Sequence, residues 1–262
     1  MTTLRVLRHA AACGFSDYAT IYTWKTWLAG WYVRVLAQVA FFALIGKLLD
    51  SQARVEYLLI GNAVMLAAVG GLFAVAGTTW ERRAGTLPLH VASPSSPVVV
   101  FTGRSAWGLT EGVLSSAGTF FVAAPLFGLE LALRSLLVLP LLVLVASSSY
   151  ALGIFLGGLV LRAMSTRNVV ANVVSATMMA ICGVNVPVEF FPEPIQWVGQ
   201  ALPLTHGLHA IRDVLGGGSA ASIIVNAALE LLVGLVWLGL ALVTFNRLAE
   251  GGRRSGAIEF AA

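Results

Sequence analysis

Apolar runs about twenty residues long recur along this chain of 262 residues. A helix needs about 20 apolar residues to cross the roughly 30 Å hydrocarbon core of a bilayer. The alternating apolar and polar strands of 9–11 residues that would indicate a membrane β-barrel do not occur. We therefore predict an all-α integral membrane protein with six transmembrane helices. The predicted spans are residues 28–49, 57–78, 104–128, 135–161, 168–187 and 222–246.

The composition excludes the soluble classes of protein. Hydrophobic residues make up 58% of the chain and charged residues 11%, and the mean hydropathy is +0.87. A soluble domain carries roughly 25% charged residues, and a compact globule of this size could not hide so much apolar surface. A soluble enzyme and a disordered chain are excluded. The net charge of +4 is a modest excess, so we expect membrane lipid and no nucleic acid as a partner.

The basic residues predict the orientation, because cytoplasmic segments of membrane proteins are enriched in Lys and Arg. If the N-terminus is cytoplasmic, the segments outside the membrane hold only Arg54, Arg134 and Arg212. The inside segments then hold Arg5, Arg8, Lys25, Arg82, Arg83, Arg104, Arg162, Arg167, Arg247, Arg253 and Arg254. We expect a multi-pass protein of the inner or plasma membrane with both termini in the cytoplasm.

Residues 1–27 are neither a span nor an ordinary tail. Aromatic residues recur there and just beyond at helical spacing: Tyr18, Tyr22, Trp24, Trp27 and Trp31. Such a segment can lie as a helix in the headgroup plane before turning into the first span. The alternative is a frayed cytoplasmic tail.

Residues 188–221 are too apolar for a plain loop and are broken by prolines. Broken apolar helices at membrane depth occur only where protein or a cavity satisfies the freed backbone groups. We expect an external re-entrant pair of half-helices before the last span. The alternative is an amphipathic helix on the outer leaflet.

Two blocks of residues carry a resemblance to a known family. The stretch Glu81-Arg82-Arg83-Ala84-Gly85-Thr86-Leu87, closing at Ser93-Pro94, resembles the cytoplasmic coupling segment of ABC-2 type transporter permeases. A second block resembles the family's segment between its fifth and sixth spans. That block holds Pro187, Phe191-Pro192, Leu202-Pro203-Leu204-Thr205-His206 and Arg212. The chain is similar in particular to daunorubicin-resistance and lipo-oligosaccharide export permeases. Pro88 departs from the pattern, because the family commonly has an acidic residue there.

The resemblance implies a type V exporter-like fold and a membrane half-transporter without its own ATPase. The sequence agrees, since it has no phosphate-binding G-x-x-x-x-G-K-[ST] loop. We therefore expect no enzymatic activity and no cofactor in this chain. Two copies of a separate ABC ATPase would bind ATP and Mg, and a second permease, identical or related, would complete the complex. The coupling segment, residues 79–97 of a link that runs to 103, would contact the ATPase through Glu81, Arg82, Arg83, Gly85, Thr86 and Leu87.

The resemblance also implies a transport pathway at a dimer interface, lined by the first, second and fifth spans. The residues it selects are Arg34, Gln38, Asn62, Met65, Asn172, Ser175 and Met179. Ordinary interhelical packing is the alternative for these polar and polarizable groups, and Arg34 could simply snorkel to the interface.

An external gate is expected from the second block. Its residues are Pro187, Phe191, Pro192, Pro203, His206 and Arg212. His206, His209 and Asp213 have a spacing that could suit a metal, but the family block explains His206, so no metal site is predicted.

Other polar and small residues within the spans indicate packing. Glu111 and Glu230 need either a buried partner or an interfacial position. Gly108-x-x-x-Gly112 and Gly153-x-x-x-Gly157 predict close helix contacts among the third and fourth spans or their neighbours.

The predicted function is ATP-driven export by alternating access. Because no large cytoplasmic or external module is evident, we expect a hydrophobic drug, natural product or lipid-like cargo, as in antibiotic-resistance and multidrug exporters. Export of a polysaccharide or lipid-linked glycan is the alternative. A secondary carrier would more often show internal repeats and charged residues deep in broken spans, and neither is evident.

Overall fold

The computed structural model describes residues 3–77, 97–160 and 166–255 of the chain. Every element in these ranges is helical, which confirms the predicted all-α class. The elements are α1 (Thr3–Ile21), α2 (Trp24–Thr26), η1 (Trp27–Tyr32), α3 (Val33–Leu48), α4 (Gln52–Leu72), α7 (Pro97–Leu126), η2 (Leu133–Leu137), α8 (Val138–Val160), α9 (Arg167–Ile181), η4 (Val188–Phe190), α10 (Glu193–Ala201), α11 (Thr205–Gly216) and α12 (Ala220–Ser255).

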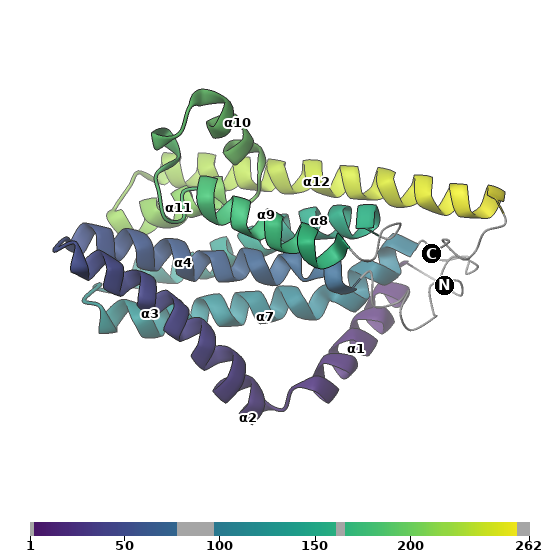
Figure 1. The fold of residues 1–262 in the computed structure, drawn as a ribbon, viewed down its shortest axis with the longest axis horizontal. Helices are drawn as coiled ribbons and strands as arrows, with labels where there is room; N and C mark the ends of the chain where they lie inside the picture. The colour runs from purple at the N-terminus through teal and green to yellow at the C-terminus, as the bar shows by residue number, and fades with distance from the viewer. Residues whose placement is uncertain (1–2, 78–96, 161–165, 256–262) are drawn as a thin grey trace.

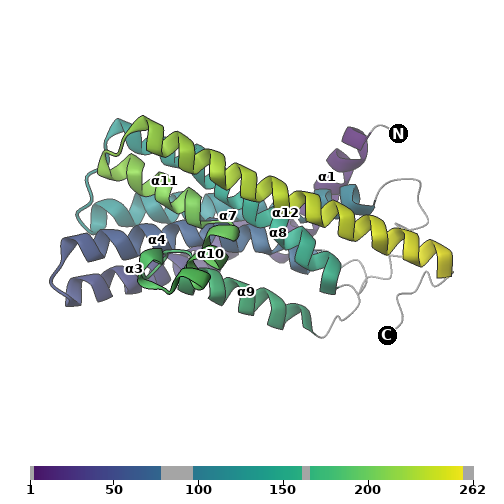
Figure 2. The ribbon, with the colours of Figure 1, turned by 90° about the horizontal axis from the view of Figure 1, so that it is seen from above.

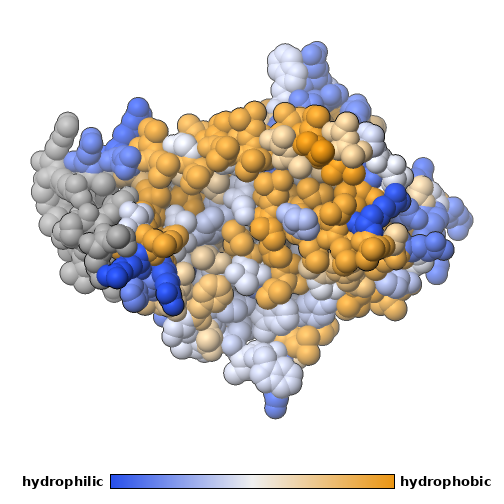
Figure 3. Space-filling view, turned by 180° about the vertical axis from the view of Figure 1, so that it is seen from behind, coloured by the Kyte–Doolittle hydropathy of each residue, from blue (hydrophilic) through white to orange (hydrophobic). Residues whose placement is uncertain are grey.

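The long helices run side by side as a bundle (Figures 1 and 2). In the described ranges, five helices are long and apolar enough to cross a membrane. They are Trp24–Leu48, Gln52–Gly77, Val98–Leu126, Leu133–Val160 and Ala220–Leu248. Hydrophobic residues form a broad band across the middle of one face, and hydrophilic residues gather toward its ends (Figure 3). This distribution is the one that a lipid bilayer requires.

The first span begins at Trp24, earlier than the predicted residue 28. The helix is interrupted at Tyr22 and Thr23. Thr23 and Thr26 cap the next helix, because each side chain bonds to the backbone of the other residue. Such a capping box satisfies N–H groups that a helix start leaves free. Trp24, Trp27 and Trp31 therefore belong to the first span, whereas α1 is a separate helix at an angle to it (Figure 1).

Helix α1 packs against α7 rather than standing apart. A Cβ atom on Gly14 would lie 2.1 Å from the Arg104 carbonyl oxygen, and one on Gly103 would lie 2.5 Å from the Ala10 Cβ. The glycines therefore let the two backbones approach closely. Arg104 also forms an ion pair with Asp17 at 2.6 Å. These contacts make a frayed tail the wrong interpretation of this segment.

The fifth predicted span, 168–187, is helical only as far as Ile181. Gly183 has a positive φ of +85°, which a glycine adopts without strain, and residues 182–187 form no regular helix. Helix α9 is thus 15 residues long. It runs along the bundle and carries the chain back from the end where α8 finishes (Figure 1).

Helix α4 is the centre of the bundle. A Cβ atom on Gly70 would lie 2.3 Å from the Gly112 Cα atom of α7, and one on Gly71 would lie 2.5 Å from the Ala146 carbonyl oxygen of α8. Gly108 and Gly153 also meet α4 backbone. The glycine spacing correctly predicted close contacts, and the shared neighbour of both motifs is the second span.

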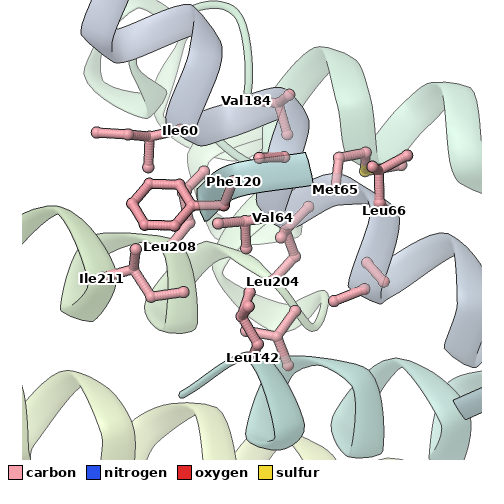
Figure 4. Close-up of a cluster of buried hydrophobic side chains, with 14 of the residues drawn as sticks. Ile60, Val64, Met65, Leu66, Phe120, Leu142, Val184, Leu204, Leu208 and Ile211 are labelled. Atoms are coloured by element: carbon pink, nitrogen blue, oxygen red, sulfur yellow. The ribbon is translucent and has the colours of Figure 1, made fainter. Parts of the chain in front are cut away.

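The core gathers where α4, α7, α8 and α11 meet (Figure 4). It contains Ile60, Val64, Met65, Leu66, Phe120, Leu142, Val184, Leu204, Leu208 and Ile211. Lipid tails are as apolar as these side chains, so close van der Waals packing, rather than exclusion from water, holds such a cluster together.

Candidate functional site

The segment between α9 and α12, residues 182–219, folds onto one end of the bundle (Figures 1 and 2). Its two helices differ in burial. In α10 only Gly199 is buried, and the Trp197 side chain is 63% exposed. In α11 the side chains of Leu208 and Ile211 are fully buried in the core. The segment therefore presents one exposed helix and inserts a second one into the core. Its re-entrant role stays a prediction.

Glu230 of α12 anchors the start of α11. Its carboxylate accepts hydrogen bonds from the Leu204 N–H at 2.9 Å and from the Gly207 N–H at 3.0 Å. The Ser148 hydroxyl of α8 donates to the same carboxylate. The Glu230 side chain is fully buried. One carboxylate thus joins α8, α11 and α12. Of the two alternatives that the sequence left open for Glu230, the structure shows a buried carboxylate with partners in the protein.

The contact between the Glu230 carboxylate and the start of α11 is electrostatically favourable. The first N–H groups of a helix have no partner within it and carry partial positive charge, so an anion is stabilised there. Leu204 has a φ of +96°, which is unfavourable for a residue with a side chain. The fixed carboxylate and the buried Leu204 side chain hold the backbone in this conformation.

Arg212 of α11 ties the same helix to α4. Its guanidinium carbon lies 3.6 Å from the centre of the Tyr57 ring, and one of its nitrogens donates to the Tyr57 carbonyl oxygen at 3.2 Å. The Tyr57 hydroxyl donates to the Gly183 carbonyl oxygen at 2.8 Å. A stacked arginine in a desolvated position contributes up to about 2 kcal/mol. Tyr57 therefore holds both ends of the segment to the bundle.

The irregular residues after α9 rest directly on α4. A Cβ atom on Gly61 would lie 2.1 Å from the Val184 carbonyl oxygen. The Asn62 side-chain amide donates to the Asn185 side-chain oxygen at 2.8 Å. The Asn62 amide supplies a partner for a polar side chain that lies outside any regular helix, as membrane depth requires.

Comparisons with known proteins agree with this architecture. The family model described as ABC-2 type transporter matches residues 16–215, a range that runs from α1 to the end of α11. The chain belongs to the ABC-2 type transporter family. A search of the curated proteins found no match to the chain.

Membership in the ABC-2 family makes this chain the permease of an ABC-type transporter, a multi-pass membrane protein that works with an ABC ATPase. The expected family resemblance is confirmed at this level.

The predicted gate residues of this ABC-2 permease fall into two groups. Pro187 and Pro192 are exposed and precede η4 and α10, where a fixed φ suits the start of a helix. Phe191 lies between these two helices. Pro203, His206 and Arg212 belong to the turn and helix that enter the core. The prediction that they control opening is not tested by their positions.

The predicted pathway residues differ in how deeply they are buried. Asn62 and Met65 are buried in α4, where Asn62 bonds to Asn185. Arg34 and Asn172 are exposed, while Gln38, Ser175 and Met179 are partly exposed. Asn62 and Met65 thus pack inside the bundle of this permease, and the other five lie on or near its surface. The pathway role of all seven stays a prediction.

The predicted ATPase-coupling residues lie outside the described residues. They are Glu81, Arg82, Arg83, Gly85, Thr86 and Leu87.

His206, His209 and Asp213 have a spacing that could suit a metal. In the structure the Asp213 carboxylate instead accepts a hydrogen bond from the Ser222 hydroxyl at 2.6 Å. No three His, Cys, Asp or Glu side chains gather into a metal site anywhere in the described ranges.

Sequence reasoning missed Tyr57, Ser148 and Asn185. Tyr57 stands at the end of an apolar run, and no periodicity distinguishes it from an interfacial tyrosine. The run Ser147-Ser148-Ser149 in a span was the available signal for a polar contact, because hydroxyl groups at that depth bond to protein.

Proposed function

We propose that this permease exports a hydrophobic drug, natural product or lipid-like molecule by alternating access, driven by a separate ATPase. The observation that carries the proposal is the light packing of α9, which has Met178 as its single buried residue. A helix held by few contacts is the one that moves at low cost. Its exposed apolar residues, such as Val169 and Val173, suit a lipophilic cargo and a second permease.

Six membrane passes follow if α9 and residues 182–187 form one pass. Helix α8 ends and α12 begins at opposite ends of the bundle (Figure 1), so the chain must return between them. The 15 residues of α9 span about 22 Å, which is short of the roughly 30 Å core. The irregular residues that rest on α4 supply the rest of the path. Six passes also place both termini on the same side.

The pathway would lie between two permeases, identical or related, that meet through α3 and α9. Arg34, Gln38, Asn172, Ser175 and Met179 remain accessible on these helices and would face it. Asn62 would act behind this surface by holding Asn185 in place, and Met65 would pack in the core beneath it.

The coupling segment, residues 79–97, would dock on the ATPase that binds ATP and Mg. This segment joins α4 to α7, and those helices are in backbone contact at Gly70 and Gly112. Helix α4 also contacts α11 and residues 183–185 through Tyr57 and Gly61. A push on the segment would therefore reach the external segment through one rigid helix.

The test is co-purification with the ATPase encoded beside this permease, followed by reconstitution into liposomes. We expect a stable complex whose ATP hydrolysis is stimulated by a lipophilic cargo and whose transport requires ATP. Stimulation by a lipid-linked glycan alone would favour glycan export. Transport without any nucleotide would indicate a secondary carrier and overturn the proposal.

A further inference from the structure

An aromatic pocket lies where α1 turns into the first span and both face α7. Its volume is about 270 Å³. Its lining includes Tyr18, Tyr22, Trp24, Trp27, Trp107 and Glu111. Nothing in the export function proposed above uses this pocket.

The pocket walls are rings fixed by contacts with one another. Tyr18 stacks on Trp107 with ring centres 4.6 Å apart, and Tyr22 lies 5.3 Å from Tyr18. Trp107 is backed by Phe73 at 5.8 Å. Trp24 is 72% exposed and forms an outer wall. The rings therefore form a preorganised surface and do not need to collapse around a ligand.

The acidic side chain in this wall is that of Glu111. Glu111 is 5% exposed, and the Ser115 hydroxyl donates to its Oε1 atom at 2.6 Å. Ser115 is itself held by the Trp31 indole N–H at 3.1 Å. Within the described ranges, no Lys, Arg or His side chain lies within 4 Å of this carboxylate.

Arg34 interacts electrostatically with this carboxylate without forming an ion pair within 4 Å. Its guanidinium carbon lies 4.4 Å from the centre of the Trp31 ring, so the cation is occupied with an aromatic face. Burial disfavours the charged form of a carboxylic acid, and a cation bound beside it favours that form, so an ammonium group in the pocket would stabilise the Glu111 carboxylate. Aromatic residues that only anchor a helix at the interface would not need a carboxylate among them.

We propose that this pocket binds an organic ammonium group. Aromatic faces attract a cation within about 6 Å of the ring centre, and cages of such rings recognise quaternary ammonium groups. Lys25 already places its ammonium nitrogen 5.6 Å from the centre of the Trp24 ring. Glu111 supplies the complementary charge. The volume admits a substituted ammonium head and leaves an attached chain in the surrounding lipid.

The ammonium group could come from a lipid headgroup or from a free cationic compound, and one experiment distinguishes them. The full permease is placed in nanodiscs of phosphatidylglycerol, which carries no ammonium group. Binding of choline and of 3,3-dimethyl-1-butanol, its neutral isostere, is measured by saturation-transfer NMR. We expect choline to bind at least about tenfold more tightly than the isostere.

Variants test the two components of the pocket. Glu111→Gln keeps the acceptor for Ser115 and removes the charge, so the preference for choline should fall to about one. Trp24→Leu removes an exposed wall that supports little else, and should weaken choline binding about fivefold. The matched controls Glu130→Gln and Trp197→Leu alter an exposed glutamate and an exposed tryptophan elsewhere, and should change nothing.

Adding phosphatidylcholine to the nanodiscs identifies the source of the group. Weaker apparent choline binding would show that the lipid headgroup occupies the pocket, and unchanged binding would indicate a free cation. Equal affinities of the wild-type permease for choline and its isostere would overturn the proposal. So would the absence of saturable choline binding, or a preference that survives both Glu111→Gln and Trp24→Leu.

Discussion

Two side chains, the buried Glu230 and the partly buried Arg212, hold α11 in the core of the permease. Both come from charged residue types that are costly at membrane depth. Each has several specific partners: backbone N–H groups and Ser148 for Glu230, and the ring and carbonyl of Tyr57 for Arg212. Their first role is therefore to fix a helix that begins inside the bundle.

Replacing Glu230 should destabilise the permease. Glu230→Leu leaves the N–H groups of Leu204 and Gly207 without an acceptor, at a cost of about 1–3 kcal/mol for each group. Glu230→Gln keeps one acceptor oxygen and should have a smaller effect. Thermal unfolding in detergent, followed by size-exclusion chromatography, measures both. Glu130→Leu, at an exposed position, is the control, and equal melting temperatures of the Glu230 and Glu130 variants would contradict the anchoring role.

The two contacts of Tyr57 can be separated by substitution. Tyr57→Phe keeps the ring under Arg212 and removes the hydrogen bond to Gly183, a loss of about 1 kcal/mol. Tyr57→Leu removes both contacts and should cost more. The readout is the rate at which limited proteolysis cuts within residues 182–191. We expect the order wild type, Phe, Leu in increasing rate, and an equal rate for all three would show that Tyr57 does not hold this segment.

Helix α4 illustrates how elements in this bundle depend on small residues. Its Gly70 and Gly71 contact α7 and α8 at backbone distance, so the helix is surrounded on several sides. Gly70→Leu places a side chain where a Cβ atom alone would lie 2.3 Å from Gly112, which must separate the helices. We expect a large loss of folded protein in detergent. Gly239→Leu, where no heavy atom lies within 4 Å of the added Cβ, should leave the yield unchanged.

The coupling segment can be tested as an element. Replacing Glu81, Arg82 and Arg83 together with Ala should leave membrane insertion intact, because these residues lie outside the spans predicted from the sequence. It should uncouple ATP hydrolysis from transport, because the proposed contact with the ATPase is lost. Cargo-stimulated hydrolysis and cargo uptake are measured in the same liposomes. Normal transport by the triple variant would remove these residues from the coupling role.

The whole molecule makes a prediction about sidedness. The start of α1 and the end of α12 lie at one end of the bundle, and the turn before η2 lies at the other (Figure 1). In a background lacking Cys13 and Cys182, a cysteine at Leu4 should resist a membrane-impermeant maleimide in intact cells. A cysteine at Leu133, 84% exposed, should react. A cysteine at Thr86 should be protected like that at Leu4, and its labelling from outside would overturn the six-pass arrangement.

The apolar runs and their flanking charges were sufficient for the class of this protein. Length and hydropathy alone place most of the spans, because the bilayer imposes its thickness on any helix that crosses it. The ends were less accurate, since the first span begins at Trp24 rather than at residue 28, and α7 begins at Pro97 rather than at residue 104. The glycine pairs predicted tight packing, but they could not identify α4 as the shared neighbour.

What the sequence determined by itself is a helical membrane protein with the family's two characteristic blocks, because those signals are local in the chain. What only the tertiary structure decided is the pairing of distant groups: Glu230 with the start of α11, Arg212 with Tyr57, and Glu111 with the rings of the aromatic pocket. A buried charge indicates that it needs a partner, but the partner depends on which helices are neighbours. That choice follows from packing in three dimensions, which no spacing along one chain encodes.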